Sequence, residues 1–214
     1  MKISDFGGET AIIKLIEGLT ARDDERVVVG IGDDAAVLRT GGDKLLIVTT
    51  DLLVEGTHFK RDLIDPYSLG WKAVAVNISD IAAMGGNPTY GFISIALPDI
   101  ESSFVEELYE GMNAISHQFG SKIIGGDTNR VDGQIVINVT QLGDIEEGKA
   151  ALRKGANTGD RILVTGNLGD SLAGLKILLR DGLDAGCTTH PEIIERHIRP
   201  LPRVHEGSTA VETG

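Results

Sequence analysis

Four short segments combine aspartate with glycine, serine or threonine, and each of them could bind a divalent cation or a phosphate. They are residues 30–34 (GIGDD), 49–51 (TTD), 77–80 (NISD) and 125–128 (GGDT). Carboxylate and hydroxyl oxygens are the ligands that Mg²⁺ prefers in proteins. Glycines beside them let backbone N–H groups approach phosphate oxygens closely. The combination indicates a site that handles the phosphates of a magnesium-bound nucleotide.

A simpler interpretation of each segment is an ordinary turn, because aspartate after glycine is common in turns. The recurrence of the pattern within residues 30–128, with apolar residues on several flanks, favours a shared metal site. Three segments follow a strand or a short apolar run, whereas residues 77–80 lie inside a predicted helix. Strand ends meet at one rim of a sheet, so we expect the acidic groups to converge there. Convergent carboxylates raise one another's pKa unless a cation lies between them.

The elements that must position these segments follow from hydrophobic periodicity. Helices are predicted over residues 9–20, 65–84, 101–119, 170–180 and 192–198, and strands over residues 27–29, 45–48, 90–97, 122–124, 134–142 and 161–164. This order predicts an α+β fold in which residues 1–148 form a mixed β-sheet with helices packed on one face. Residues 149–214 are expected to be an incomplete second α/β domain. Asp80 then has to reach the rim from a helix.

Composition argues against several classes of protein. The net charge of −12 disfavours nucleic acid as a partner, since a polyanion would be repelled. No apolar run approaches the ~20 residues that a membrane span needs, and the N-terminus is unlike a signal peptide, so we expect a cytoplasmic protein without a membrane segment. The single cysteine, Cys187, rules out an internal disulfide. The classical nucleotide motifs G-x-x-x-x-G-K-[ST] and G-x-G-x-x-G are missing.

One of the five histidines is a candidate for substrate binding, and the other four are not. His58 follows the TTD segment within EGTHF, where it is either a substrate contact or a structural hydrogen-bond partner. The others are interpreted as surface or helix-face residues without ligand roles: His117, His190, His197 and His205.

Several segments in order resemble the thiamine-monophosphate kinase family, of the aminoimidazole-ribonucleotide-synthetase-like superfamily. They are GIGDDAAVL, TTDLLVEGTHF, KAVAVNISDIAAMGGNP, IIGGDTNR, ALRKGANTGDRILVTGNLGDSLAGL and HIRPLPRV. The resemblance covers residues 5 to 205 and implies Mg²⁺-dependent transfer of the γ-phosphoryl group of ATP onto thiamine monophosphate, giving thiamine diphosphate. It implies an in-line transfer that uses several magnesium ions, and a homodimer formed through the N-terminal sheet. It therefore makes residues 1–148 an ATP- and Mg-binding and dimerisation domain.

The resemblance also implies roles for individual residues. Gly126 and Arg153 match nucleotide contacts, and His58 matches a substrate contact. The residues that match magnesium ligands are Asp34, Thr49, Thr50, Asp51, Asp80 and Asp127. No residue matches a general base, and a phosphate acceptor that is already ionised needs none.

The sequence departs from the family at one point. The family has a further acidic motif, D-[IL]-S-D-G-L, which would complete the metal cluster, and the present sequence does not contain it. We therefore expect a C-terminally truncated family member. Two other interpretations stay open: a related enzyme such as a hydrogenase maturation factor, and a catalytically incomplete fragment that binds nucleotide or only dimerises.

Overall fold

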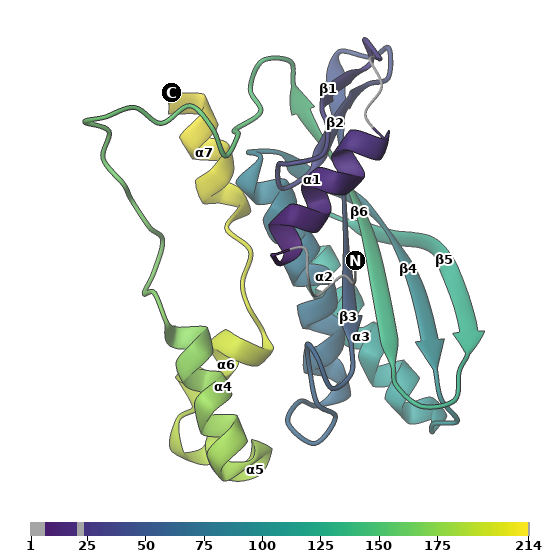
Figure 1. Ribbon diagram of the computed structural model, residues 1–214. Helices are drawn as coiled ribbons and strands as arrows, with labels where there is room; N and C mark the ends of the chain where they lie inside the picture. Colours follow the sequence, from purple (N-terminus) through teal and green to yellow (C-terminus); the bar gives the residue numbers. More distant parts are fainter. Residues whose placement is uncertain (1–6, 21–23, 214) are drawn as a thin grey trace.

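A mixed β-sheet is the centre of the structure, a computed structural model that describes residues 7–20 and 24–213. Within these residues the strands are β1 (Val27–Val29), β2 (Ala36–Arg39), β3 (Lys44–Val54), β4 (Asn87–Leu97), β5 (Lys122–Arg130) and β6 (Val136–Glu146). Their order across the sheet is β1-β2-β3-β6-β4-β5 (Figure 1). Strands β4 and β5 pair in parallel, and the other neighbours are antiparallel. The predicted α+β class is confirmed.

Helices α2 (Pro66–Ala83) and α3 (Ser102–Gln118) cover one face of this sheet. The Asp65 carboxylate caps α2 by accepting the backbone N–H of Ser68 at 2.8 Å, and Pro66 occupies the first helical turn. Alternate residues of the central strands point toward the helices, because side-chain direction in a strand has a period of two. The buried core is formed by residues of both layers, among them Leu53, Ile93, Ile137, Leu69, Ile78, Leu108 and Met112.

The two helices approach each other closely at a pair of glycines. A Cβ on Gly70 would lie 1.9 Å from the carbonyl oxygen of Leu108, and one on Gly111 would lie 1.9 Å from that of Tyr67. Neither position has room for a side chain. The close approach keeps α2, which carries Asp80, tightly held between α3 and the sheet.

The opposite face of the sheet, called the open face below, carries apolar side chains that are exposed. Leu52 of β3, Tyr90 and Phe92 of β4, and Ile124 of β5 are between 36% and 53% accessible to solvent. An antiparallel sheet commonly has one solvated face, but that face is then mainly polar. A row of exposed apolar groups is instead typical of a surface that another molecule covers.

Residues 170–213 are mainly helical. Helices α4 (Asp170–Asp181), α5 (Leu183–Thr189) and α6 (Pro191–Ile198) form a group, and α7 (Val204–Thr213) returns to α2 (Figure 1). Leu178, Ile194 and Ile198 belong to the same buried cluster as the sheet core. The α4–α6 group is therefore anchored on the main core, where α6 contacts α2. Helix α1 (Glu9–Thr20) has no buried residue.

The expected strand at residues 161–164 is wrong. These residues have no regular structure, and Ile162 and Leu163 are 93% and 88% exposed. A strand needs a hydrogen-bonding neighbour, and none of the described residues provides one. In place of an α/β arrangement, the described residues after 149 contain helices and loops. The periodicity also missed β2, α5 and α7, which are short and weakly periodic.

The lengths of two strands change the position of the acidic segments. β3 runs through residues 49–51 and β5 runs through residues 125–128, so Asp51 and Asp127 lie inside strands rather than at strand ends.

Among the helices of the described residues, none has the length and hydropathy to cross a bilayer.

Candidate metal and phosphate site

Three elements meet at the side chain of Thr49. Its hydroxyl lies 2.8 Å from a carboxylate oxygen of Asp80 on α2 and 3.3 Å from the backbone carbonyl oxygen of Asp34, which precedes β2. Thr49 is buried and belongs to the row of β3 side chains that face the helices. The structure therefore brings residues 34, 49 and 80 together, and their role as metal ligands stays a prediction.

Asp51 joins this group from two residues further along β3, on the same face of the strand. The pKa of Asp80 is raised to about 6, chiefly by burial; the hydrogen bond from Thr49 opposes the rise, and the charges of Asp51 and Asp34 add to it. Burial also raises the pKa of Asp51, against the opposing effect of His58. We call Asp34, Asp51 and Asp80 the acidic cluster. Its members repel one another when ionised, which is the arrangement that a shared cation relieves.

The donor set fits magnesium. Its members supply carboxylate and hydroxyl oxygens without a thiolate or imidazole nitrogen, a combination that suits a hard cation. In the part of the chain that the structure describes, no three acidic, histidine or cysteine side chains are already arranged as a metal cage. Asp34 is instead paired with the guanidinium of Arg153.

Arg153 connects the acidic cluster to the glycine-rich segment before β2. Its guanidinium donates to the Asp34 carboxylate, with Nε at 3.0 Å, and its backbone N–H donates to the Asp33 carboxylate at 3.3 Å. A hollow of about 340 Å³ lies between Gly30–Gly32 and Leu152–Lys154. Glycine backbone on one side and two cationic side chains on the other form a surface suited to phosphate oxygens.

Thr50 and Asp127 lie on the other side of the sheet. The Thr50 hydroxyl is 2.9 Å from Asn138 Nδ2, on the open face. Asn138 pairs with Ser94 in the next strand, and Ser94 pairs with Asp127, so these residues form one row across that face. Side chains of neighbouring strand residues point to opposite faces, which separates Thr50 from Thr49 and Asp127 from the acidic cluster. Their predicted role as metal ligands stays a prediction.

Gly126 has a reason of its own to be glycine. It has φ of +152° and pairs with Ile93, whose carbonyl oxygen would lie 1.8 Å from a Cβ at this position. The neighbouring backbone therefore excludes a side chain at this position, independently of any contact with a nucleotide. The predicted nucleotide contact of Gly126 stays a prediction.

His58 makes the structural hydrogen bond that was one of its two interpretations. Its Nδ1 accepts the backbone N–H of Val54 at 2.9 Å, inside a tight turn closed by Gly56 and Phe59. A ring nitrogen that accepts carries no hydrogen, so the neutral imidazole has its N–H at Nε2. That donor is left for a ligand, and the predicted substrate contact is compatible with the turn.

Asp33 belongs to a candidate segment but has no predicted role, His197 is interpreted from the sequence as a helix-face residue, and no sequence pattern indicates Lys72. Lys72 and His197 are both partly buried, although lysine is rarely so, and they contact each other across more than a hundred residues of chain. No local pattern could indicate this pairing, because α2 and α6 come together only in the folded chain. His197 does lie on a helix face, as expected, but on the face that packs inward.

The raised pKa of Asp80 predicts a specific pH dependence of stability. The folded state holds the Asp80 proton more tightly than the unfolded state, whose pKa is near 3.8. Without metal, this group's contribution to the free energy of unfolding is complete below pH 4 and is lost as the pH rises through about 6. Asp80→Asn has no such proton to lose, so its free energy of unfolding should not show this decrease. Measured by urea unfolding, the stability of the variant relative to the wild type should therefore increase between pH 4 and pH 7. If the free energies of unfolding of variant and wild type change in parallel with pH, the pKa of Asp80 is not raised in the folded state.

The comparisons with known proteins agree with this geometry. The family model described as AIR synthase related protein, N-terminal domain, matches residues 32–145. Thiamine-monophosphate kinase from Bacillus subtilis (strain 168) is 42% identical over 197 residues, which are 90% of this chain and 61% of the relative. The chain thus spans about three fifths of the length of that relative.

Two solved structures are similar over nearly the whole chain. The one described as AaThiL complexed with AMPPCP and TMP has a TM-score of 0.86 and 36% identity, and the match covers 99% of this chain and 65% of that one. The thiamine monophosphate kinase from Aquifex aeolicus has a TM-score of 0.81 and 34% identity, with coverage of 99% and 66%. Since the family model alone covers more than half of its 214 residues, the chain belongs to the AIR synthase related protein family and carries its N-terminal domain.

Proposed function

We propose that this protein transfers the γ-phosphoryl group of ATP to thiamine monophosphate, with Mg²⁺ as the required cation. The observation that carries the proposal is the acidic cluster, held beside Thr49 and Arg153 at the edge of a glycine-lined hollow. The resemblance to thiamine-monophosphate kinases supplies the choice of acceptor. Because ATP is the co-substrate, the proposal places the protein in the cytoplasm.

Each group would contribute binding or positioning rather than proton transfer. Asp34, Thr49, Asp51 and Asp80 would hold magnesium, which offsets the charge of the phosphates and aligns donor and acceptor for an in-line transfer. Arg153 would move from Asp34 to a phosphate oxygen once the carboxylate is bound to a cation. The acceptor phosphate is ionised at neutral pH, which agrees with the absence of an evident general base in the described site.

A coupled assay of ADP release, paired with calorimetry of Mg-ATP binding, tests the proposal. We expect ADP release that requires both Mg²⁺ and thiamine monophosphate. Mg-ATP binding without turnover would favour the catalytically incomplete fragment, and turnover with other acceptors in a substrate panel would favour a related enzyme such as a hydrogenase maturation factor. Absence of Mg-ATP binding would overturn the whole class.

The open face supports a homodimer as part of the proposal. Exposed apolar side chains gather there, and the row that contains Ser94 and Asp127 lies among them. A second copy that covers the open face would bury this apolar surface and bring its own Asp127 into the assembly. Asp127 would then act on a site whose Asp80 belongs to the other copy.

Mixing two inactive variants tests this arrangement. If each site uses Asp80 of one copy and Asp127 of the other, an Asp80→Asn chain paired with an Asp127→Asn chain contains one intact site. Random mixing should then restore about a quarter of the wild-type ADP-release rate, since half of the dimers are mixed. Each variant alone, refolded in the same way, is the control. If the mixture remains as inactive as the separate variants, both residues serve the site of one chain.

A further inference from the structure

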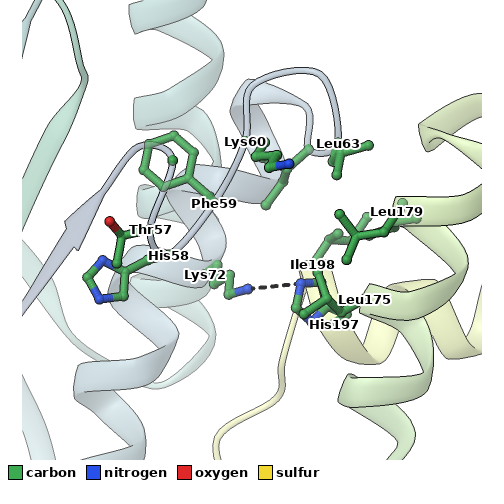
Figure 2. Close-up of a pocket in the computed structure, with 13 residues that line it drawn as sticks. Thr57, His58, Phe59, Lys60, Leu63, Lys72, Leu175, Leu179, His197 and Ile198 are labelled. Atoms are coloured by element: carbon green, nitrogen blue, oxygen red, sulfur yellow. Dashed lines mark hydrogen bonds between the residues drawn. The ribbon is translucent and has the colours of Figure 1, made fainter.

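A second pocket lies between the turn after β3, helix α2 and the α4–α6 group. It has a volume of about 300 Å³ and is enclosed mainly by apolar side chains (Figure 2). Phe59, Leu63, Leu175, Leu179 and Ile198 form its walls. This volume is at the lower end of the range of small-molecule sites in proteins.

The polar groups of this pocket are cationic or neutral. Lys60 and Lys72 contribute amines, and the lining that the structure describes includes no aspartate or glutamate. That is unusual in a chain with a net charge of −12. Among the described residues Lys72 forms no salt bridge, and its one polar contact is His197 Nε2 at 3.5 Å (Figure 2). A partly buried ammonium group without a carboxylate partner is costly, as its lowered pKa reflects.

His197 does not provide the missing negative charge. Its Nδ1 lies 3.0 Å from the Ser171 hydroxyl, and burial, followed by the nearby Lys72, lowers its pKa to about 4. The imidazole is therefore neutral at physiological pH, and its Nε2 can accept one hydrogen from Lys72 while Nδ1–H is directed to Ser171. Two hydrogens of the Lys72 ammonium remain without an acceptor in these contacts.

We propose that this pocket binds a small anion, a phosphate ester or carboxylate carried on an aromatic or apolar body, with Lys72 as its charge partner. The apolar walls would bury the body, and the two lysines would bind the anionic group. His58 also lies on the lining, but its ring is turned away from the Lys72 amine (Figure 2). The same lysines disfavour a cationic ring that carries no anionic group, so thiamine itself would not bind in this pocket.

Binding of phenyl phosphate tests the proposal without nucleotide or magnesium. Isothermal titration calorimetry measures the binding directly. We expect saturable binding of phenyl phosphate and at least tenfold weaker binding of phenol, which has the same ring without the charge. The Lys72→Met variant should lose at least tenfold in affinity for phenyl phosphate. Lys122→Met, which removes an exposed lysine at the start of β5, should bind as the wild type does.

Stability separates a ligand-binding lysine from a structural one. Removing an unpaired, partly buried charge should leave Tm unchanged or raise it by about 2–4 °C. Lys72→Arg should retain most of the affinity because it keeps the charge. A Lys72→Met variant that binds phenyl phosphate normally, or one whose Tm falls by several degrees, would overturn the proposal.

Competition identifies the source of the anion. Displacement of phenyl phosphate by thiamine monophosphate but not by thiamine would assign the pocket to the phosphate end of the proposed substrate. Displacement by neither would support a separate anionic ligand. Equal displacement by both would show that the ring is recognised, and the proposal would be wrong. Because these measurements involve no turnover, their failure would leave the proposed kinase activity to its own test.

Discussion

The Asp80→Asn variant is expected to release ADP about 100- to 1000-fold more slowly than the wild type at saturating Mg²⁺ and ATP. Asp80 is held by Thr49 at the centre of the acidic cluster, and its charge is the one most exposed to repulsion from Asp34 and Asp51. Asparagine keeps the size and the hydrogen bond from Thr49 but cannot offer the charge that a hard cation needs. The coupled ADP assay measures the rate, and the Mg²⁺-dependent rise in Tm measures cation binding.

The matched control is Asp99→Asn, which changes an exposed aspartate in the loop between β4 and α3. This loop lies outside the acidic cluster and the glycine-lined hollow. The variant should retain the wild-type rate and the wild-type response of Tm to Mg²⁺. An Asp80→Asn variant that keeps both properties would show that the acidic cluster is not the cation site, and the proposed function would lose its main support.

The Gly111→Ala variant is expected to lower the free energy of unfolding by about 3 kcal/mol. The added Cβ would overlap the carbonyl oxygen of Tyr67, and backbone cannot rotate away as a flexible side chain can. Helices α2 and α3 must therefore separate, which opens the core that both bury against the sheet. Thermal unfolding should show a fall in Tm of roughly 6–12 °C for a chain of this length.

Gly18→Ala is the control, because Gly18 also lies in a helix but a Cβ added there would have no described atom within 4 Å. There the lower flexibility of alanine should leave stability unchanged or raise it by about 0.5–1 kcal/mol. If the two variants have similar stability, the close approach of α2 and α3 is not what requires glycine at residue 111. Gly70→Ala provides a second test of the same contact from the other helix.

The sequence was sufficient for the local structure of most of the sheet layer. Regular apolar spacing and the cap formed by Asp65 and Pro66 predicted α2, and alternation predicted β4 and β6. It was also sufficient for the chemistry of the candidate site, because Thr49, Asp51 and Asp80 are oxygen donors in segments that could be recognised one at a time. Periodicity failed at residues 161–164, where an apolar run has no neighbouring strand in the described chain.

Tertiary structure decided which of the predicted residues share a site. A one-residue step along β3 puts Thr49 toward the helices and Thr50 toward the open face, and the register of β4 with β5 puts Asp127 on that same open face. It also decided the environment of Lys72, which packing places beside His197 in an apolar pocket. Of the four acidic segments, those at residues 30–34 and 77–80 contribute Asp34 and Asp80 to the helix side of the sheet, and Asp127 lies on the open face. Residue types determine what a group can bind, whereas strand register and helix packing determine which groups can bind it together.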